Sequence, residues 1–271
     1  MKISVWGVRF CLISFFLFGF FNVAYPGTLE PLGVQDARLL QKNDGEFRVG
    51  FSYFHDLHNQ FQAKDLNRRV AEIPSLSLNF GLGERVEGQV SYSFLYLQQD
   101  GKGGMWGTGD MTFGFKVKVK RDSPSFPALA VRLGAKLPNA DDTQNFGNDA
   151  SNIFVDFLGT KHFPWVDIHL NLGLTIIGSP PGGGGGQDDL LNYGLGFVIP
   201  VLPQTVTFLF SVEGLDFEDS LNGRGAVRGG FQYIWKGFIV DVGASAGYVG
   251  KSEDWSFQAG LTIPIILPPH W

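Results

Sequence analysis

Alternation of apolar residues with polar or small ones is the feature that most restricts how this chain can fold. In the segment 128–137, for example, the odd-numbered positions are leucine, valine or alanine, whereas Arg132 and Lys136 stand between them. Successive side chains of a β-strand point to opposite faces, so this period predicts strands with one apolar and one polar face. Twelve segments between residues 45 and 271 show it, which predicts an all-β protein of about 12 strands.

The period alone does not say which face is buried. A soluble barrel or sandwich turns its apolar face inward, whereas a membrane barrel turns it outward to lipid. No charged residue stands on the apolar parity of the twelve segments, while the other parity carries both acidic and basic residues. The two faces therefore differ sharply, and the choice between the two classes depends on other features.

The lengths of the connections favour the membrane class. Short turns are expected at 83–85, 162–165, 200–203 and 236–237, with a somewhat longer one at 121–127. The connections between them are mostly longer, at 56–71, 98–108, 138–150, 178–188 and 215–223, and only 249–254 is brief. This predicts a transmembrane antiparallel up-and-down β-barrel with short periplasmic turns and long outer loops.

Aromatic residues give a second indication, because amphipathic rings collect where hydrocarbon meets water. The long-loop ends of the segments carry Tyr53, Tyr96, Tyr193, Tyr248 and Trp255, and the short-turn ends carry Phe126, Trp165, Trp235, Phe238 and Trp271. Two aromatic girdles are therefore expected. Trp271 also resembles the terminal aromatic signal of such barrels, although Pro264, Pro268 and Pro269 are expected to end the last strand early or to cause a bulge in it.

The N-terminus predicts export. Lys2 and Arg9 accompany an almost purely apolar run, Phe10 to Phe21, of the length of a signal-peptide core. We therefore expect a signal peptide over residues 1–26, cleaved between residues 24 and 27, with a membrane anchor as the alternative. Residues 27–44 are expected to form a periplasmic N-terminal lead, and 45–271 the outer-membrane β-barrel. Whether the lead plugs the barrel is left open.

The polar parity is expected to line the lumen. A transverse field across the lumen is one interpretation of its charges, and ion pairs that knit a filled interior are the other. Because about eight strands leave a filled interior and about sixteen an open channel, twelve predict a narrow or plugged path. The lumen-lining candidates are Asp110, Lys116, Lys118, Arg132, Lys136, Asp156, Asp167, Glu213 and Arg228, with Gly109 at a loop turn.

Catalytic interpretations find little support. A serine hydrolase needs Ser, His and an orienting polar group close together, and no serine with an obvious partner accompanies His162 and His169 near the periplasmic rim. His55 and His58 flank Asp56 in the first outer loop, where solvated loop residues are a better interpretation than a metal or acid–base site. We therefore predict no catalytic residue.

Metal, cofactor and nucleic-acid partners are not expected either. The acidic pairs Asp141–Asp142 and Asp188–Asp189 have the chemistry to bind a divalent cation, but outer loops are commonly acidic. The glycine-rich stretches 101–109 and 182–186 lack the Lys-Ser or Lys-Thr of a phosphate loop. A net charge of −5 offers no basic footprint for nucleic acid. We predict no metal and no cofactor.

Two motifs carry a family resemblance. The stretch GTGDMTFGFKVKVK (107–120) precedes ALAVRLGAKLPNADD (128–142), and a strand ending in KHF then precedes WVDIHLNLGL. This order resembles the outer-membrane transporters of the meta-pathway of phenol degradation (MetA-pathway) family, in which a G-x-GD turn and a K-L-P-T-G-like strand end recur. Here Asn139 and Ala140 replace the usual Thr-Gly. The resemblance covers about residues 107 to 178 and implies a barrel that admits small hydrophobic or aromatic compounds.

Together these features predict an outer-membrane channel or transporter for small, hydrophobic or aromatic compounds in a Gram-negative bacterium, and not an enzyme. An outer-membrane lipid hydrolase and a structural barrel without transport are the alternatives. The expected partners are outer-membrane lipid, a small-molecule solute and the barrel-assembly machinery that reads Trp271.

Overall fold

The computed structural model describes residues 32–58, 68–99, 103–147, 149–178, 188–217 and 223–268. The predicted signal peptide and Trp271 lie outside these ranges. Thirteen strands within them form one antiparallel sheet. The strands are β1 (Asp44–His55), β2 (Arg68–Gly81), β3 (Val86–Gln99), β4 (Met105–Thr108), β5 (Thr112–Lys120), β6 (Ala128–Lys136), β7 (Asn152–Phe163), β8 (Val166–Ile177), β9 (Asp188–Leu202), β10 (Val206–Phe217), β11 (Arg224–Trp235), β12 (Phe238–Gly247) and β13 (Trp255–Ile266).

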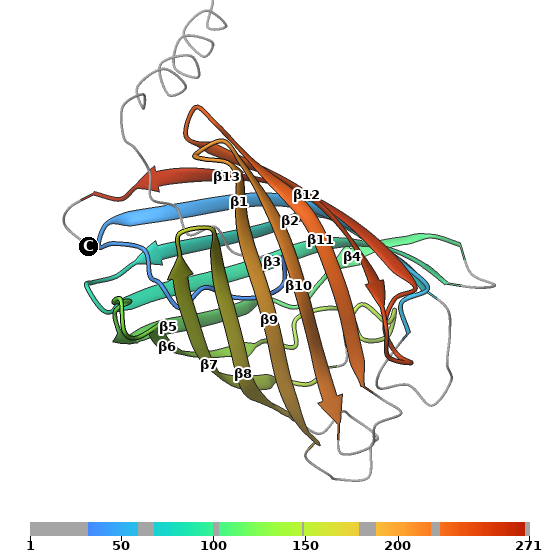
Figure 1. Ribbon diagram of the computed structural model, residues 1–271. Coiled ribbons are helices and arrows are strands. Elements are labelled where there is room, and N and C mark those ends of the chain that lie inside the picture. Colours follow the sequence, from blue (N-terminus) through green and yellow to red (C-terminus); the bar gives the residue numbers. More distant parts are fainter. Residues whose placement is uncertain are drawn as a thin grey trace, which may run out of the picture.

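The sheet closes on itself as a barrel of twelve strands (Figure 1). Neighbouring strands in the chain pair with each other, and β1 pairs with β13. The short strands β4 and β5 both pair with β3, at Phe94↔Thr108 and Ser91↔Thr112, so they are two parts of one barrel strand. The predicted all-β barrel and its strand number are confirmed.

The outer face of the barrel is apolar and the inner face is polar. Leu133, Phe157 and Leu172 are each about half exposed or more, whereas Lys116 on the opposite parity is fully buried. Trp106 and Trp255 are exposed at the rim with the long loops, and Trp165 and Trp235 at the rim with the short turns. Among the described residues, no helix has the length and apolar character needed to span a bilayer.

Two expected loops are shorter than predicted. The stretch 98–108 was expected to be a loop, but β3 continues to Gln99 and β4 pairs with it, with the rings of Tyr96 and Trp106 in contact at 5.1 Å. Likewise β2 begins at Arg68 inside the expected loop 56–71. A register shift between Glu72 and Ser75 reverses the parity of β2, so the alternation of its two halves is out of phase.

The closing seam is regular. Pro264, Pro268 and Pro269 predict an early end or a bulge of the last strand. β13 ends at Ile266, ahead of Pro268, but it pairs with β1 in one register from Trp255 to Ile266, with Pro264 opposite Glu46. The pairing of β13 with β12 ends at Thr262. Pro264 therefore has a strand neighbour on one side only, the edge position in which a missing N–H is tolerated.

Candidate functional site

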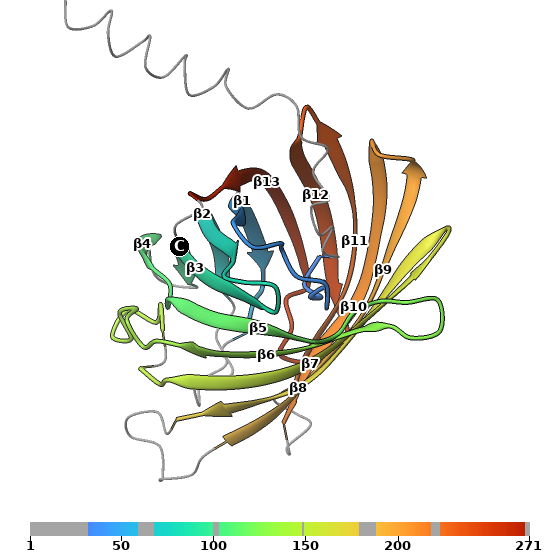
Figure 2. The ribbon, with the colours of Figure 1, turned by 90° about the vertical axis from the view of Figure 1, so that its left-hand side faces the viewer.

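The segment that precedes β1 lies inside the barrel. In Figure 2 this blue segment runs within the ring of strands, and Val34, Asp36 and Ala37 are almost completely buried in it. From here on, the lead means the described part of the predicted N-terminal lead that precedes β1, residues 32–43. The lead starts at mid-depth beside β10 and descends along β8, β7 and β3 to the short-turn rim, where β1 begins.

Hydrogen bonds from the barrel strands to the main chain of the lead hold it in place. Asn171 on β8 both accepts the N–H of Gln35, at 2.7 Å, and donates to its carbonyl oxygen, at 2.9 Å. Thr160 Oγ1 on β7 accepts the N–H of Ala37 at 2.9 Å, and Glu87 Oε2 on β3 accepts the N–H of Leu40 at 2.9 Å. Buried main-chain groups of an irregular segment need such partners, and the strands supply them.

Apolar patches on the inner wall receive the side chains of the lead. Ala37 packs against Ala128, Ala130 and Leu158 on β6 and β7. Leu32 packs against Val198 and Leu209 on β9 and β10. Glycines give the lead room: a Cβ at Gly194 would lie 3.0 Å from Val34, and one at Gly243 would overlap Leu32. The interior therefore fits the lead by shape as well as by hydrogen bonding.

A charged cluster ties the lead to the rim with the short turns. Arg38 pairs with Asp36 and with Asp167 of β8, both at 2.7 Å. Burial alone would raise the pKa of Asp36, but the charge of Arg38 and its hydrogen bonds outweigh it, so this pKa lies below its ordinary value. Asp167 also accepts from His162 Nδ1 at 2.6 Å. Asp167, a predicted lumen candidate, thus lies beneath the lead.

The fully buried pair of Lys116 and Glu87 joins β5, β3 and the lead. The Lys116 Nζ atom lies 3.0 Å from Glu87 Oε1 and donates to the carbonyl oxygen of Asp36 at 3.1 Å. Neither side chain is more than 1% exposed. Removing one partner of such a pair leaves an uncompensated buried charge. Lys116, another predicted candidate, therefore bonds directly to the lead.

The other charged candidates form ion pairs between neighbouring strands. Arg132 Nη1 lies 3.0 Å from Asp156 Oδ2, and Arg228 Nε lies 2.7 Å from Glu213 Oε1. Lys118 differs, because it lies near the short-turn rim and donates to the carbonyl oxygen of Glu84 at 2.7 Å. Positive and negative charges therefore alternate around the wall. This arrangement favours structural ion pairs between strands over a transverse field across the lumen.

The two motifs behind the family resemblance form one unit of structure. Asp110, in the break between β4 and β5, pairs with Lys136 Nζ at 2.6 Å and accepts the N–H groups of Asn139 and Ala140. In return, the side-chain oxygen of Asn139 accepts the N–H of Met111 at 2.7 Å. Gly109 begins this break, and its N–H donates to Ser93 on β3. The G-x-GD turn and the KLPNA end therefore fix each other.

The lead leaves a polar cavity of about 350 Å³ on its β1–β2–β13 side. The lining is mainly polar, from hydroxyl and amide side chains together with the charged Glu46, Arg48 and Arg132. Arg48 forms a bidentate pair with the buried Asp241 of β12. In the sequence, Arg48, Asp241 and Glu87 were indicated as lumen residues only by their place on the polar parity. Typical lining residues are Ser52, Ser75, Ser77, Asn79, Gln232 and Thr262.

A second cavity, of about 450 Å³, lies towards the long-loop rim. Part of its wall is apolar, from Phe54, Leu57, Val70 and Leu215, and part is charged, including Arg228. Behind Val70, the inner-facing Leu95 and Leu97 of β3 extend this apolar patch. Both cavities border Gly33, Gln35 and Arg132, so both reach the tip of the lead, from opposite sides of the path.

Three histidines of the described ranges contact side chains other than serine. His162 pairs with Asp167, and the buried His169 shares a hydrogen bond of 3.0 Å with Thr160. His55 lies beside Asp56 at the long-loop rim. The sequence placed His169 near the periplasmic rim but did not indicate its link to the lead through Thr160.

A closed antiparallel barrel with an apolar outer belt, a polar interior and short turns at one rim is a bacterial outer-membrane β-barrel. The comparisons with solved structures agree with this class. An outer membrane channel from Pseudomonas putida F1 superposes with a TM-score of 0.63 at 13% identity, covering 90% of this chain and 100% of that one. The translocator domain of the autotransporter NalP from Neisseria meningitidis gives 0.54 at 8% identity, covering 96% and 94%. These likenesses show the fold.

No family model matches the chain, and no curated protein matches it in sequence.

Proposed function

We propose that this chain is a passive outer-membrane channel in which small solutes pass the lead through the two cavities. The observation that carries the proposal is the position of the cavities: the polar one borders Glu46 near the short-turn rim, and the other borders Leu57 beyond the end of β1. Both cavities border Gly33 and Gln35 of the lead, so the lead is the narrowest part of the proposed path. The name of the similar Pseudomonas barrel, an outer membrane channel, supports the same function.

The lining favours small amphiphilic solutes. Contact with Phe54, Val70 and Leu215 would stabilise an apolar ring or a short chain. Polar groups of the solute would form hydrogen bonds with the hydroxyl and amide side chains of the polar cavity. The resemblance of the motifs at 107–120 and 128–142 to the meta-pathway transporters supports hydrophobic or aromatic compounds as the apolar part. The resident ion pairs satisfy most charges, so the path does not select strongly for one sign.

Conductance and liposome swelling test the proposal. The purified full chain in planar bilayers is expected to give discrete conductance steps, and its liposomes are expected to admit benzoate faster than a sugar of similar size. Leu57→Asn places an amide on the apolar wall and is expected to reduce benzoate entry. Ser77→Asn in the polar cavity is the matched control and should preserve the preference for benzoate. Absence of both conductance and swelling would overturn the channel function.

A further inference from the structure

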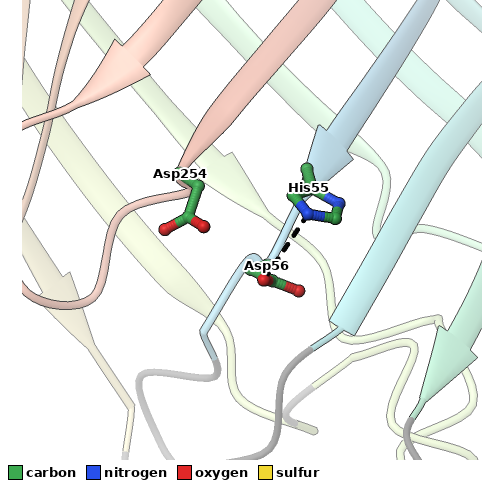
Figure 3. Close-up of side chains that lie close together, drawn as sticks. All are labelled: His55, Asp56 and Asp254. Carbon is green, nitrogen blue, oxygen red and sulfur yellow. Dashed lines mark ion pairs between the residues drawn. The ribbon is translucent and has the colours of Figure 1, made fainter.

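Three potential metal ligands meet where the barrel closes. His55 ends β1, Asp56 follows it, and Asp254 directly precedes β13, the partner strand of β1 at the seam (Figure 3). The N–H of Asp254 donates to the carbonyl oxygen of His55 at 3.0 Å, which fixes the two segments against each other. One nitrogen or oxygen atom from each side chain lies within 4.8 Å of the other two.

The imidazole of His55 is held by stacking and forms no hydrogen bond with the residues that the structure describes. His55 stacks on Trp255 with ring centroids 5.2 Å apart and an interplanar angle of 29°. Its Nδ1 is buried without a hydrogen-bond partner. Its Nε2 lies 3.6 Å from Asp56 Oδ2, beyond hydrogen-bond distance. The ring is thus oriented towards the carboxylate without being bonded to it.

The two carboxylates lack the basic partners found elsewhere in the barrel. Asp110, Asp156 and Asp241 each pair with a lysine or arginine. Within the described part of the chain, Asp56 has only the His55 ring beside it, and the Asp254 carboxylate has no ion pair. Two carboxylates without a lysine or arginine partner, beside an imidazole, make a set of donor atoms that a divalent cation would balance.

We propose that His55, Asp56 and Asp254 bind one divalent transition-metal ion of the zinc type, which fastens the closing seam at the long-loop rim. One nitrogen and two oxygen donors suit zinc or nickel better than calcium, which takes six or more oxygens. Bonds of about 2.1 Å place tetrahedral donors roughly 3.4 Å apart, so side-chain movements of about 1 Å complete the site. Water fills the remaining position, because Asp254 is exposed.

The sequence alone does not reveal this site. His55 and Asp56 adjoin in the first outer loop, but the third ligand comes from the far end of the chain. Only the register of the seam, with His55 opposite Trp255, brings Asp254 to them.

Metal titration of the full-length barrel in detergent, after treatment with a chelator, tests the site. Calorimetry is expected to show one Zn²⁺ bound per chain and a higher unfolding midpoint with the ion, because the ion binds the folded state. Ni²⁺ is expected to occupy the same site and to quench the fluorescence of Trp255, which stacks on the ligand. A Trp255→Phe variant should keep the affinity for Zn²⁺ and lose that quenching.

Variants separate the site from adventitious binding. Asp254→Asn keeps the size of the side chain and is expected to weaken Zn²⁺ binding by at least about tenfold, as is His55→Gln. His162→Gln is the matched control, because His162 also adjoins an aspartate but at the opposite rim, and it should change nothing. Heat-modifiable migration on gels confirms that each variant is folded. Absence of stoichiometric Zn²⁺ binding overturns the proposal, as does binding unchanged in both variants or equally strong binding of Ca²⁺.

Discussion

The two sides of the lumen are built from the same alternating strands, yet one of them supplies most of the hydrogen bonds to the lead, and the other bonds it only at the short-turn rim, where Gly81 accepts the N–H of Asn43. The inner faces of β3, β5, β7, β8 and β10, which we call the anchoring wall, supply Glu87, Lys116, Thr160, Asn171 and Ser211 as bonding partners. The inner faces of β1, β2 and β13, the open wall, present mainly small hydroxyl and amide side chains to the polar cavity. Specific hydrogen-bonding partners on the wall, and not free space alone, therefore determine where the lead lies.

Removing the lead should abolish the difference between the walls. Deletion of residues 32–40 is expected to join the two cavities into one path and to raise single-channel conductance several-fold, because a barrel of twelve strands is wider than its own side chains fill. Planar-bilayer recording measures the effect. Unchanged conductance in a correctly folded deletion variant would show that the lead does not limit the path.

Lys116→Met should weaken the anchoring wall. The substitution removes the bond to the carbonyl oxygen of Asp36 and leaves Glu87 buried without its cation. We expect a loss of about 3–5 kcal/mol in the free energy of unfolding, measured by urea titration in lipid vesicles, together with a higher conductance.

Arg48→Met on the open wall is the matched comparison, because it leaves the buried Asp241 unpaired. It is expected to lower stability by a similar amount without releasing the lead. Equal conductance changes in both variants would remove the distinction between the walls.

Thr160→Val should have a smaller effect on the same wall. The hydroxyl accepts the N–H of Ala37 and bonds to the buried His169, so its loss is expected to cost about 1–3 kcal/mol. The lead should also become more accessible to protease. Ser77→Val, a change of similar size on the open wall, is expected to stay within about 0.5 kcal/mol and to leave proteolysis unchanged.

Acid should release the lead from the charged cluster at the short-turn rim. Because Arg38 lowers the pKa of Asp36 in the folded state, the stabilisation is complete above the ordinary value of 3.8 and is lost as the pH falls through the lower, folded value. Conductance is therefore expected to rise only below pH 3.8. The other titratable groups that face the cluster are Asp167 and His169 of β8. Asp36→Asn should flatten this acid step, and an identical step in that variant would assign it to other groups.

The sequence predicts the barrel well, because the alternation of apolar and polar residues within each strand identifies its two faces. The parity that carries Lys116, Arg132 and Asp156 is the inner parity of the structure, and the short turns lie where proline and glycine indicate. The prediction was wrong where a local change of phase interrupts the period. The bulge between Glu72 and Ser75 hid the first half of β2, and the break at Asp110 hid β4.

The contents of the lumen were harder to predict, because they depend on which strands face one another. Arg48 and Asp241 stand far apart in the sequence and become a pair only through the closure of β1 on β13 and β12. The lead has no period, since its apolar residues meet patches on several strands. The partners of the candidates Asp110, Lys136, Glu213 and Arg228 could be identified only from the strand register.

Most of the bonds that hold the lead reach its main chain, and the ion pair of Arg38 with Asp167 is the main exception. The strands contact the carbonyl oxygens of Leu32, Gln35 and Asp36 and the N–H groups of Gln35, Ala37 and Leu40, groups that nearly every residue possesses. The position of this segment is therefore determined mainly by the barrel, and the segment itself contributes chiefly Arg38 and the apolar side chains of Leu32 and Ala37. Related chains could exchange most of the side chains of the lead and still seat it in the same place, so long as Gly33, beside the Glu213 carboxylate, stayed small.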